Sequence, residues 1–156
     1  MASNRHLGRI VALQTLYEQD FRIDCQDDSV SLAEILDRNV ARYSETIEDK
    51  DFIRSIVDGV SSRQAELDDK LQPLAPEWPL SQIARIDKII LRIGLYELEF
   101  ENDVPQKVVI NEAVELAKAF GSENSSKFIN GVLGTALRNK EASPKDKTPK
   151  KSKKGN

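Results

Sequence analysis

Residues 83–100 read I-A-R-I-D-K-I-I-L-R-I-G-L-Y-E-L-E-F, and this apolar stretch decides the fold. Its isoleucines recur every three or four positions, which is the spacing of one face of an α-helix. The stretch therefore predicts a short turn near residues 81–84 and then a buried helix that ends near Phe100. The face that we expect in the core carries Ile83, Ile86, Ile89, Ile90, Ile93 and Tyr96.

The segments on either side have the same helical periodicity. Ser31 and Glu34 form a capping-box pattern at the start of one helix, and Gly121 follows the last apolar position of another, where a left-handed C-terminal cap is expected. The helix that begins at Pro105 is expected to break or bend near residues 108–111. The other predicted helices cover about residues 4–22, 32–44 and 49–71 and a final helix from about residue 125.

A proline-rich stretch interrupts this pattern. Pro73, Pro76 and Pro79 come three residues apart, which no helix interior tolerates, so we expect a seam between two halves near residues 73–80. The sequence thus predicts an all-α protein of about seven helices in two packed sub-bundles, covering residues 1–139. Residues 140–156 contain no apolar side chain larger than alanine and are expected to form a disordered, lysine-rich tail.

Composition excludes several classes of function. The 156 residues suit one domain, and their single cysteine and single histidine leave no internal disulfide, no zinc site and no spare general base. No glycine-rich phosphate-binding motif and no apolar run of membrane-spanning length occurs. The expectation is a cytoplasmic protein that is not an enzyme and that needs neither a metal nor a cofactor.

The net charge of −3 conceals a strong asymmetry. Residues 140–156 carry +5, residues 1–17 and 117–139 carry +2 each, and residues 18–116 carry −12. An acidic surface repels a polyanion, so a nucleic-acid site should be small and should lie where residues 1–17 and 117–139 meet.

Both basic stretches contain candidate RNA contacts. Lys127 and Phe128 follow Asn124 and Ser125 at the start of the last helix, where free backbone N–H groups suit a phosphate and an aromatic ring can stack on an unpaired base. Alternatively, Phe128 closes the edge of the core and Lys127 is merely solvated.

The first helix offers a second set of contacts. Arg5 and Arg9 lie four residues apart and hence on one helical face, where they can bind successive phosphates. The alternative is an ordinary solvated helix end.

Three runs of sequence together resemble the NusB family of bacterial transcription antitermination factors. They are R-x-x-x-R-x-x-A-x-Q-x-L-Y from Arg5 to Tyr17, D-K-I-I-L-R-I-G-L-Y-E-L from Asp87 to Leu98, and the long run D-V-P-Q-K-V-V-I-N-E-A-V-E-L-A-K-A-F-G-S-E-N-S-S-K-F-I-N-G-V-L from Asp103 to Leu133. The resemblance covers nearly all of residues 1–139 and implies two small helical bundles packed side by side.

The resemblance also implies a function without catalysis. Members of the family bind the boxA element of ribosomal RNA transcripts as single-stranded RNA, together with the small-subunit ribosomal protein NusE. The complex joins other Nus factors on RNA polymerase, and family members occur as monomers and as homodimers. The positions that contact RNA in the family correspond here to Arg5, Arg9, Asn124, Ser125, Lys127 and Phe128.

Two other classes of function also contain or resemble helical domains of this kind. A NusB-like domain also occurs fused to an RNA methyltransferase, but that enzyme needs a large α/β domain for which 156 residues leave no place. A helical protein–protein adaptor without RNA contact stays open, because the acidic residues 18–116 suit a basic partner protein.

Overall fold

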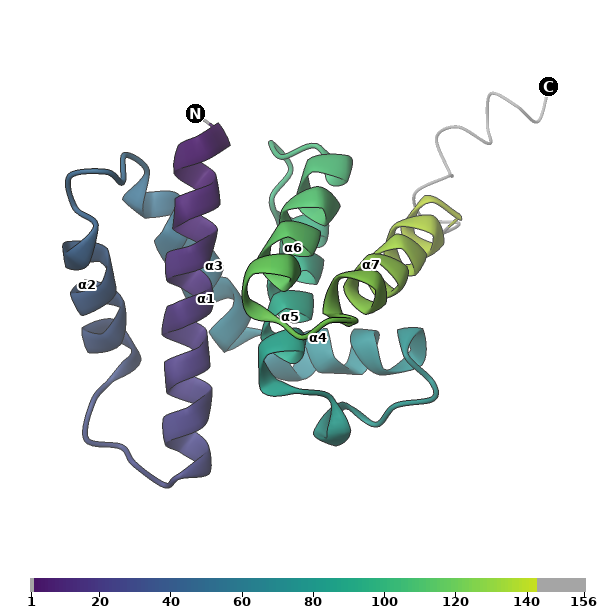
Figure 1. Ribbon diagram of the computed structural model, residues 1–156, viewed down its shortest axis with the longest axis horizontal. Helices are drawn as coiled ribbons and strands as arrows, with labels where there is room; N and C mark the ends of the chain where they lie inside the picture. The colour runs from purple at the N-terminus through teal and green to yellow at the C-terminus, as the bar shows by residue number, and fades with distance from the viewer. Residues whose placement is uncertain (1, 143–156) are drawn as a thin grey trace.

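The computed structural model describes residues 2–142, which form seven α-helices and two 3-10 turns (Figure 1). The all-α class and the number of helices are therefore confirmed. The rest of the predicted lysine-rich tail, residues 143–156, lies outside the described residues. The elements are α1 (Ala2–Asp24), α2 (Leu32–Arg42), α3 (Lys50–Ser62), α4 (Gln64–Leu71), η1 (Gln72–Leu74), η2 (Leu80–Gln82), α5 (Arg85–Phe100), α6 (Gln106–Phe120) and α7 (Ser125–Ala142).

Helix α5 is the centre of the molecule. It packs against α1, α3, α4, α6 and α7, and nearly all of its residues from Ile89 to Leu98 are buried. This explains why its sequence is apolar almost all round rather than on one stripe. The isoleucine-rich stretch is therefore the shared core of two groups of helices.

The two groups divide near Arg63. Helices α1, α2 and α3 pack on one another, and α4, α6 and α7 surround α5 (Figure 1). The expected single helix over residues 49–71 is two helices, because α3 packs on α1 and α5 whereas α4 packs chiefly on α5. The proline-rich segment joins α4 to α5, two helices that contact each other, so it lies within the second group and not between the groups.

The helix ends follow the sequence signals in part. Ser31 and Glu34 form the expected capping box at the start of α2. Helix α6 is continuous, so the break expected near residues 108–111 does not occur, and Val109 and Ile110 lie in the core. Helix α7 continues to Ala142, three residues into the stretch predicted as a tail. Within the described residues no helix combines the length and the hydropathy of a membrane span.

Gly121 is required for a different reason from the one predicted. Its backbone is extended (φ −93°, ψ −169°) and not left-handed. A Cβ atom at this position would lie 2.6 Å from the Cβ of Ser125 and 2.8 Å from the carbonyl oxygen of Ala117. Glycine therefore permits the close approach of the α6–α7 turn to the start of α7.

Two glycine substitutions test the packing between α3 and α5. A Cβ on Gly59 would lie 2.2 Å from Cζ of the buried Tyr96, so Gly59→Ala should lower the free energy of unfolding by about 1–3 kcal/mol through overpacking. Gly131, inside α7, has open space around it, and Gly131→Ala should instead stabilise the helix by about 0.5–1 kcal/mol. Thermal unfolding followed by circular dichroism measures both; equal effects of the two substitutions would contradict the packing argument.

Candidate nucleic-acid interface

Arg9 lies inside the protein. Its side chain is 3% exposed, its Nε donates to Oε2 of Glu97 at 2.8 Å, and its Nη2 donates to Oε1 of the same carboxylate at 2.7 Å. Glu112 lies 3.6 Å from Nη1. The expectation that Arg9 offers an exposed cation to a phosphate is corrected, because its donors are already used by a buried carboxylate.

Glu97 is the acidic half of this pair and is 1% exposed. Burial raises its pKa above the ordinary value, and the Arg9 guanidinium opposes that rise by favouring the charged carboxylate. The two side chains join the first half of α1 to the second half of α5. Arg9 therefore positions the start of α1 rather than binding a ligand.

Arg5 remains partly accessible but is flanked by acids. Its side chain is 29% exposed, its Nη2 lies 3.3 Å from Oδ2 of Asp49 and 3.4 Å from Oδ2 of Asp103, and its guanidinium lies 4.3 Å above the Phe52 ring. Its neighbour His6 contacts Oε1 of Glu112 at 2.7 Å. A phosphate at this end of α1 would have to compete with carboxylates for Arg5.

The start of α7 presents the other expected contacts. Asn124 and Lys127 are exposed, and Phe128 is half-buried at the rim of an open pocket of about 290 Å³. Ser125 is 2% exposed, and its Oγ accepts a hydrogen bond from the backbone N–H of Ser122 at 2.8 Å. Ser125, one of the positions that correspond to RNA contacts in the family, thus holds the α6–α7 turn with its hydroxyl.

Arg5 and the pocket at Phe128 do not lie in one cleft. Arg5 contacts Asp103, which lies just beyond the last turn of α5, whereas the pocket at Phe128 is lined by Ala84 and Asp87 at the first turn of α5. A helix of this length spans about 24 Å. The two stretches do meet where Gln14 and Tyr17 of α1 line a pocket with Phe120 of α6. Helix α6 lies between α1 and α7 (Figure 1), so Arg5 does not share a cleft with Lys127 and Phe128.

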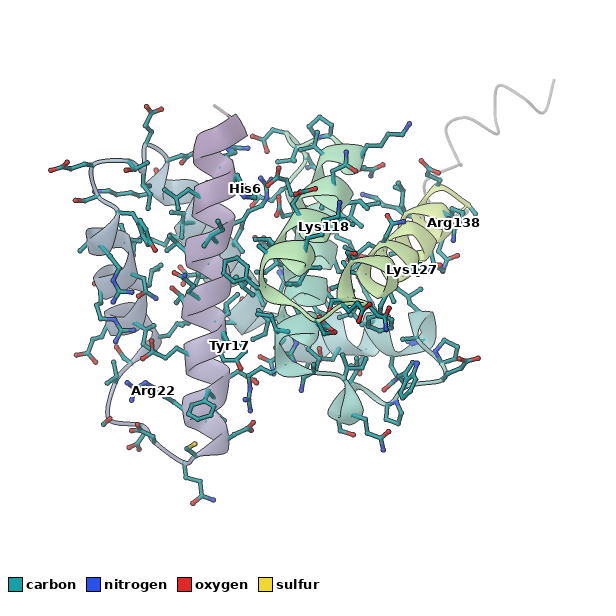
Figure 2. All side chains as sticks on the ribbon, viewed as in Figure 1. His6, Tyr17, Arg22, Lys118, Lys127 and Arg138 are labelled. Atoms are coloured by element: carbon teal, nitrogen blue, oxygen red, sulfur yellow. The ribbon has the colours of Figure 1, made fainter. Side chains whose placement is uncertain are left out.

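Helix α6 contributes a cation of its own between α1 and α7. Lys118 has a side chain that is 60% exposed and lies 3.6 Å from Oε2 of Glu115. In the view of Figure 2, Lys118 on α6 lies between His6 on α1 and Lys127 on α7. The exposed basic groups are therefore spread across three helices.

Two residues of the pocket were missed by sequence reasoning. Trp78 is 53% exposed, and Asp87 is 9% exposed with its Oδ1 atom buried and without a hydrogen-bond partner among the described residues. The only tryptophan of the chain lies in a proline-rich segment that cannot be helical, and Asp87 is an acid on the apolar side of a buried helix. Both features are visible in the sequence and could have pointed to a site. The pocket lining is Trp78, Gln82, Ile83, Ala84, Asp87, Ser122, Asn124, Ser125 and Phe128.

No cluster of three or more metal-binding side chains occurs in the part of the chain that the structure describes. The fold and the site together define a small helical protein with an exposed aromatic pocket at the start of its last helix. The sequence model of the NusB family matches residues 6–138, and the chain belongs to this family.

Individual relatives agree with this assignment. The chain is 42% identical to the transcription antitermination protein NusB of Chloroflexus aggregans, over 88% of this chain and 89% of the relative. The solved structure of NusB from T. maritima is 33% identical, with a TM-score of 0.74 over 84% of this chain and 88% of that chain. The fold also matches a structure of antitermination factors NusB and NusE in complex with double-stranded RNA, at 24% identity and a TM-score of 0.74, over 86% of this chain and 96% of that chain.

Replacing Arg9 with methionine should leave the Glu97 carboxyl buried without its partner. The free energy of unfolding should fall by about 3–5 kcal/mol near neutral pH. With the cation gone, the pKa of Glu97 rises further above that of the unfolded chain, so the folded protein holds a proton that the unfolded chain has released. The loss of stability should therefore be larger at about pH 8 than at about pH 5.

Urea denaturation at the two pH values measures this difference. The double variant Arg9→Met with Glu97→Gln is the control, because it has no buried carboxyl to titrate and should lose the added pH dependence. A single variant that is equally destabilised at both pH values would show that Glu97 does not depend on Arg9.

Proposed function

We propose that this protein is a transcription antitermination factor that binds single-stranded, boxA-like RNA of ribosomal RNA transcripts together with NusE. Membership of the NusB family supports the proposal, as does the name that its relatives share, transcription antitermination protein NusB. The solved structure of NusB and NusE in complex with double-stranded RNA supports the choice of NusE and of RNA as partners. The protein acts by binding and not by catalysis.

The observation that carries the RNA proposal is the surface at the start of α7. The half-buried Phe128 packs against the core and also lines an open pocket, and the exposed Lys127 precedes it. An aromatic edge beside a cation suits an unpaired base attached to a phosphate. Asn124, also exposed, adds an amide that can donate to RNA and carries no charge to repel it.

The strand of RNA extends from α7 across α6 toward α1 in this proposal. Lys118 and Lys127 supply charge along the path, and Arg5 binds at its far end by exchanging Asp49 and Asp103 for a phosphate. Such contacts position the strand and add little sequence preference. The RNA must be extended, because its contacts lie at opposite ends of α5.

Residues 18–116 are acidic and suit a basic partner such as a ribosomal protein. In this proposal NusE binds to this acidic part of the protein. The complex would act in the cytoplasm, with other Nus factors and RNA polymerase reached through it. The protein can also form a homodimer in this proposal, since members of the family occur both as monomers and as homodimers.

A protein–protein adaptor without RNA contact is the second candidate function. The observation that favours it is a set of exposed apolar side chains at the end of α1 and on α6, namely Tyr17, Phe21, Ile23 and Phe120. Specific retention of boxA-like RNA in a filter-binding assay at two salt concentrations separates the two proposals, because a pure adaptor retains none.

Phe128→Ala should weaken the binding of boxA-like RNA by about 1–3 kcal/mol through the loss of base stacking. Fluorescence anisotropy with the full chain, with and without NusE, measures the effect, and wild-type protein should bind more tightly when NusE is present. Phe21→Ala removes an aromatic ring that is 51% exposed on α1 and should leave the RNA affinity measured without NusE unchanged. The helical circular dichroism signal must be intact in both variants; normal RNA affinity of Phe128→Ala would then refute the stacking role.

Lys127→Ala should change the salt dependence of binding. Each phosphate contact to single-stranded RNA contributes about 0.7 to the slope of log affinity against log salt, so the slope should flatten by about that amount. Arg42→Ala is the matched control, since it removes one exposed cation from α2, on the other side of α1 from α7 (Figure 1). Identical slopes for the two variants would place Lys127 outside the RNA path.

A further inference from the structure

The pocket at Phe128 is lined by residues from three segments of the chain and includes one acid, Asp87. Trp78 comes from the proline-rich segment, Phe128 from the start of α7 and Asp87 from the first turn of α5. We propose that Trp78, Asp87 and Phe128 bind a single unpaired base, and that Asp87 selects guanine through its N–H donors. This inference rests on the proposed RNA-binding function and names the base that the site prefers.

Trp78 is held in place although its ring is largely in solvent. The Gln72 side chain donates from Nε2 to the backbone carbonyl of Trp78 at 2.9 Å, and its Oε1 accepts from the backbone N–H of Leu80 at 3.0 Å. Pro76 and Pro79 further restrict the segment. The backbone that carries this exposed ring is therefore held in place, which lowers the cost of ordering it when a base stacks on the ring.

Asp87 provides the reason to expect a base rather than an apolar ligand. Its Oδ1 atom is buried and has no hydrogen-bond partner among the described residues, and a buried polar atom without a partner is costly. A ligand that donates hydrogen bonds into the pocket removes that cost. A phosphate would be repelled by the carboxylate, so the base of a nucleotide enters and its phosphate stays outside, near Lys127.

The choice among the bases follows from their donors. A carboxylate only accepts hydrogen bonds, and it can accept two in parallel. The Watson–Crick edge of guanine offers two neighbouring donors, N1–H and N2–H₂, whereas adenine and cytosine offer one amino group beside an acceptor. Guanine therefore offers two donors to the Asp87 carboxylate while its ring stacks against Trp78 and Phe128.

The test uses uridine dodecamers that carry one guanosine, inosine or adenosine at the centre, bound to the full chain with and without NusE. Wild-type protein should bind the guanosine RNA on the order of tenfold more tightly than the adenosine RNA, with inosine between them because it lacks the N2 amino group. Asp87→Asn should lose the guanosine preference and gain affinity for adenosine, since an amide offers one donor and one acceptor.

Trp78→Ala should weaken the binding of all three RNAs by about tenfold, because stacking does not depend on the base. The order of the three affinities should stay the same. Two controls match these variants. Phe21→Ala, compared without NusE, removes an exposed aromatic outside the pocket. Glu123→Gln removes a negative charge from the exposed α6–α7 turn beside the pocket without changing the order of the three RNAs. Glu123→Gln thus separates a general gain in RNA affinity from a change in base preference.

The outcomes distinguish this inference from the function on which it rests. If wild-type protein binds none of the RNAs, nor a boxA-like RNA, the proposed function fails. If RNA binds and Phe128→Ala weakens it, but Asp87→Asn keeps the guanosine preference, only the base pocket is refuted. If Asp87→Asn leaves the RNA order intact and instead abolishes binding to NusE, the pocket receives a cationic side chain of a protein partner, which also overturns the inference.

Discussion

The buried pair of Arg9 and Glu97 is the interaction on which the arrangement of the two helix groups depends. It joins α1, which packs with α2 and α3, to α5, which α4, α6 and α7 surround. An ion pair in a dry environment is costly to break, since either partner alone would be left buried and charged. The pair therefore fixes one register of α1 against α5, and it determines where the surface side chains of both helices lie.

Much of the fold follows from the sequence, because helical periodicity and end signals are local. The apolar stretch at 83–100 became the central helix α5, and the Ser31–Glu34 capping box starts α2 as expected. The break at Arg63 and the unbroken α6 were missed, since both depend on which distant helix each apolar face meets. The role of Gly121 was misread for a similar reason: its neighbours in space, and not its φ angle, require the absence of a side chain.

The candidate site was predicted less completely than the fold. Lys127, Asn124 and Phe128 lie at an accessible surface, as their positions at the start of the last helix suggested. Arg9 could not be judged from the spacing of arginines, because its buried partner lies 88 residues away in the sequence. The charge of a segment likewise says nothing about which of its cations are already neutralised inside the fold. Trp78 and Asp87 come together only through the turn that precedes α5.

The length of α5 sets the distance between Arg5 and the Phe128 pocket. Since Arg5 lies beyond one end of this helix and the Phe128 pocket lies at the other, a ligand that is shorter than the helix can occupy one end at a time. A ligand long enough to occupy both ends gains the second contact without a second loss of translational freedom, so its affinity exceeds that of either half. The helical core thus favours ligands that are long enough to reach both ends of α5, whatever chemical groups they carry.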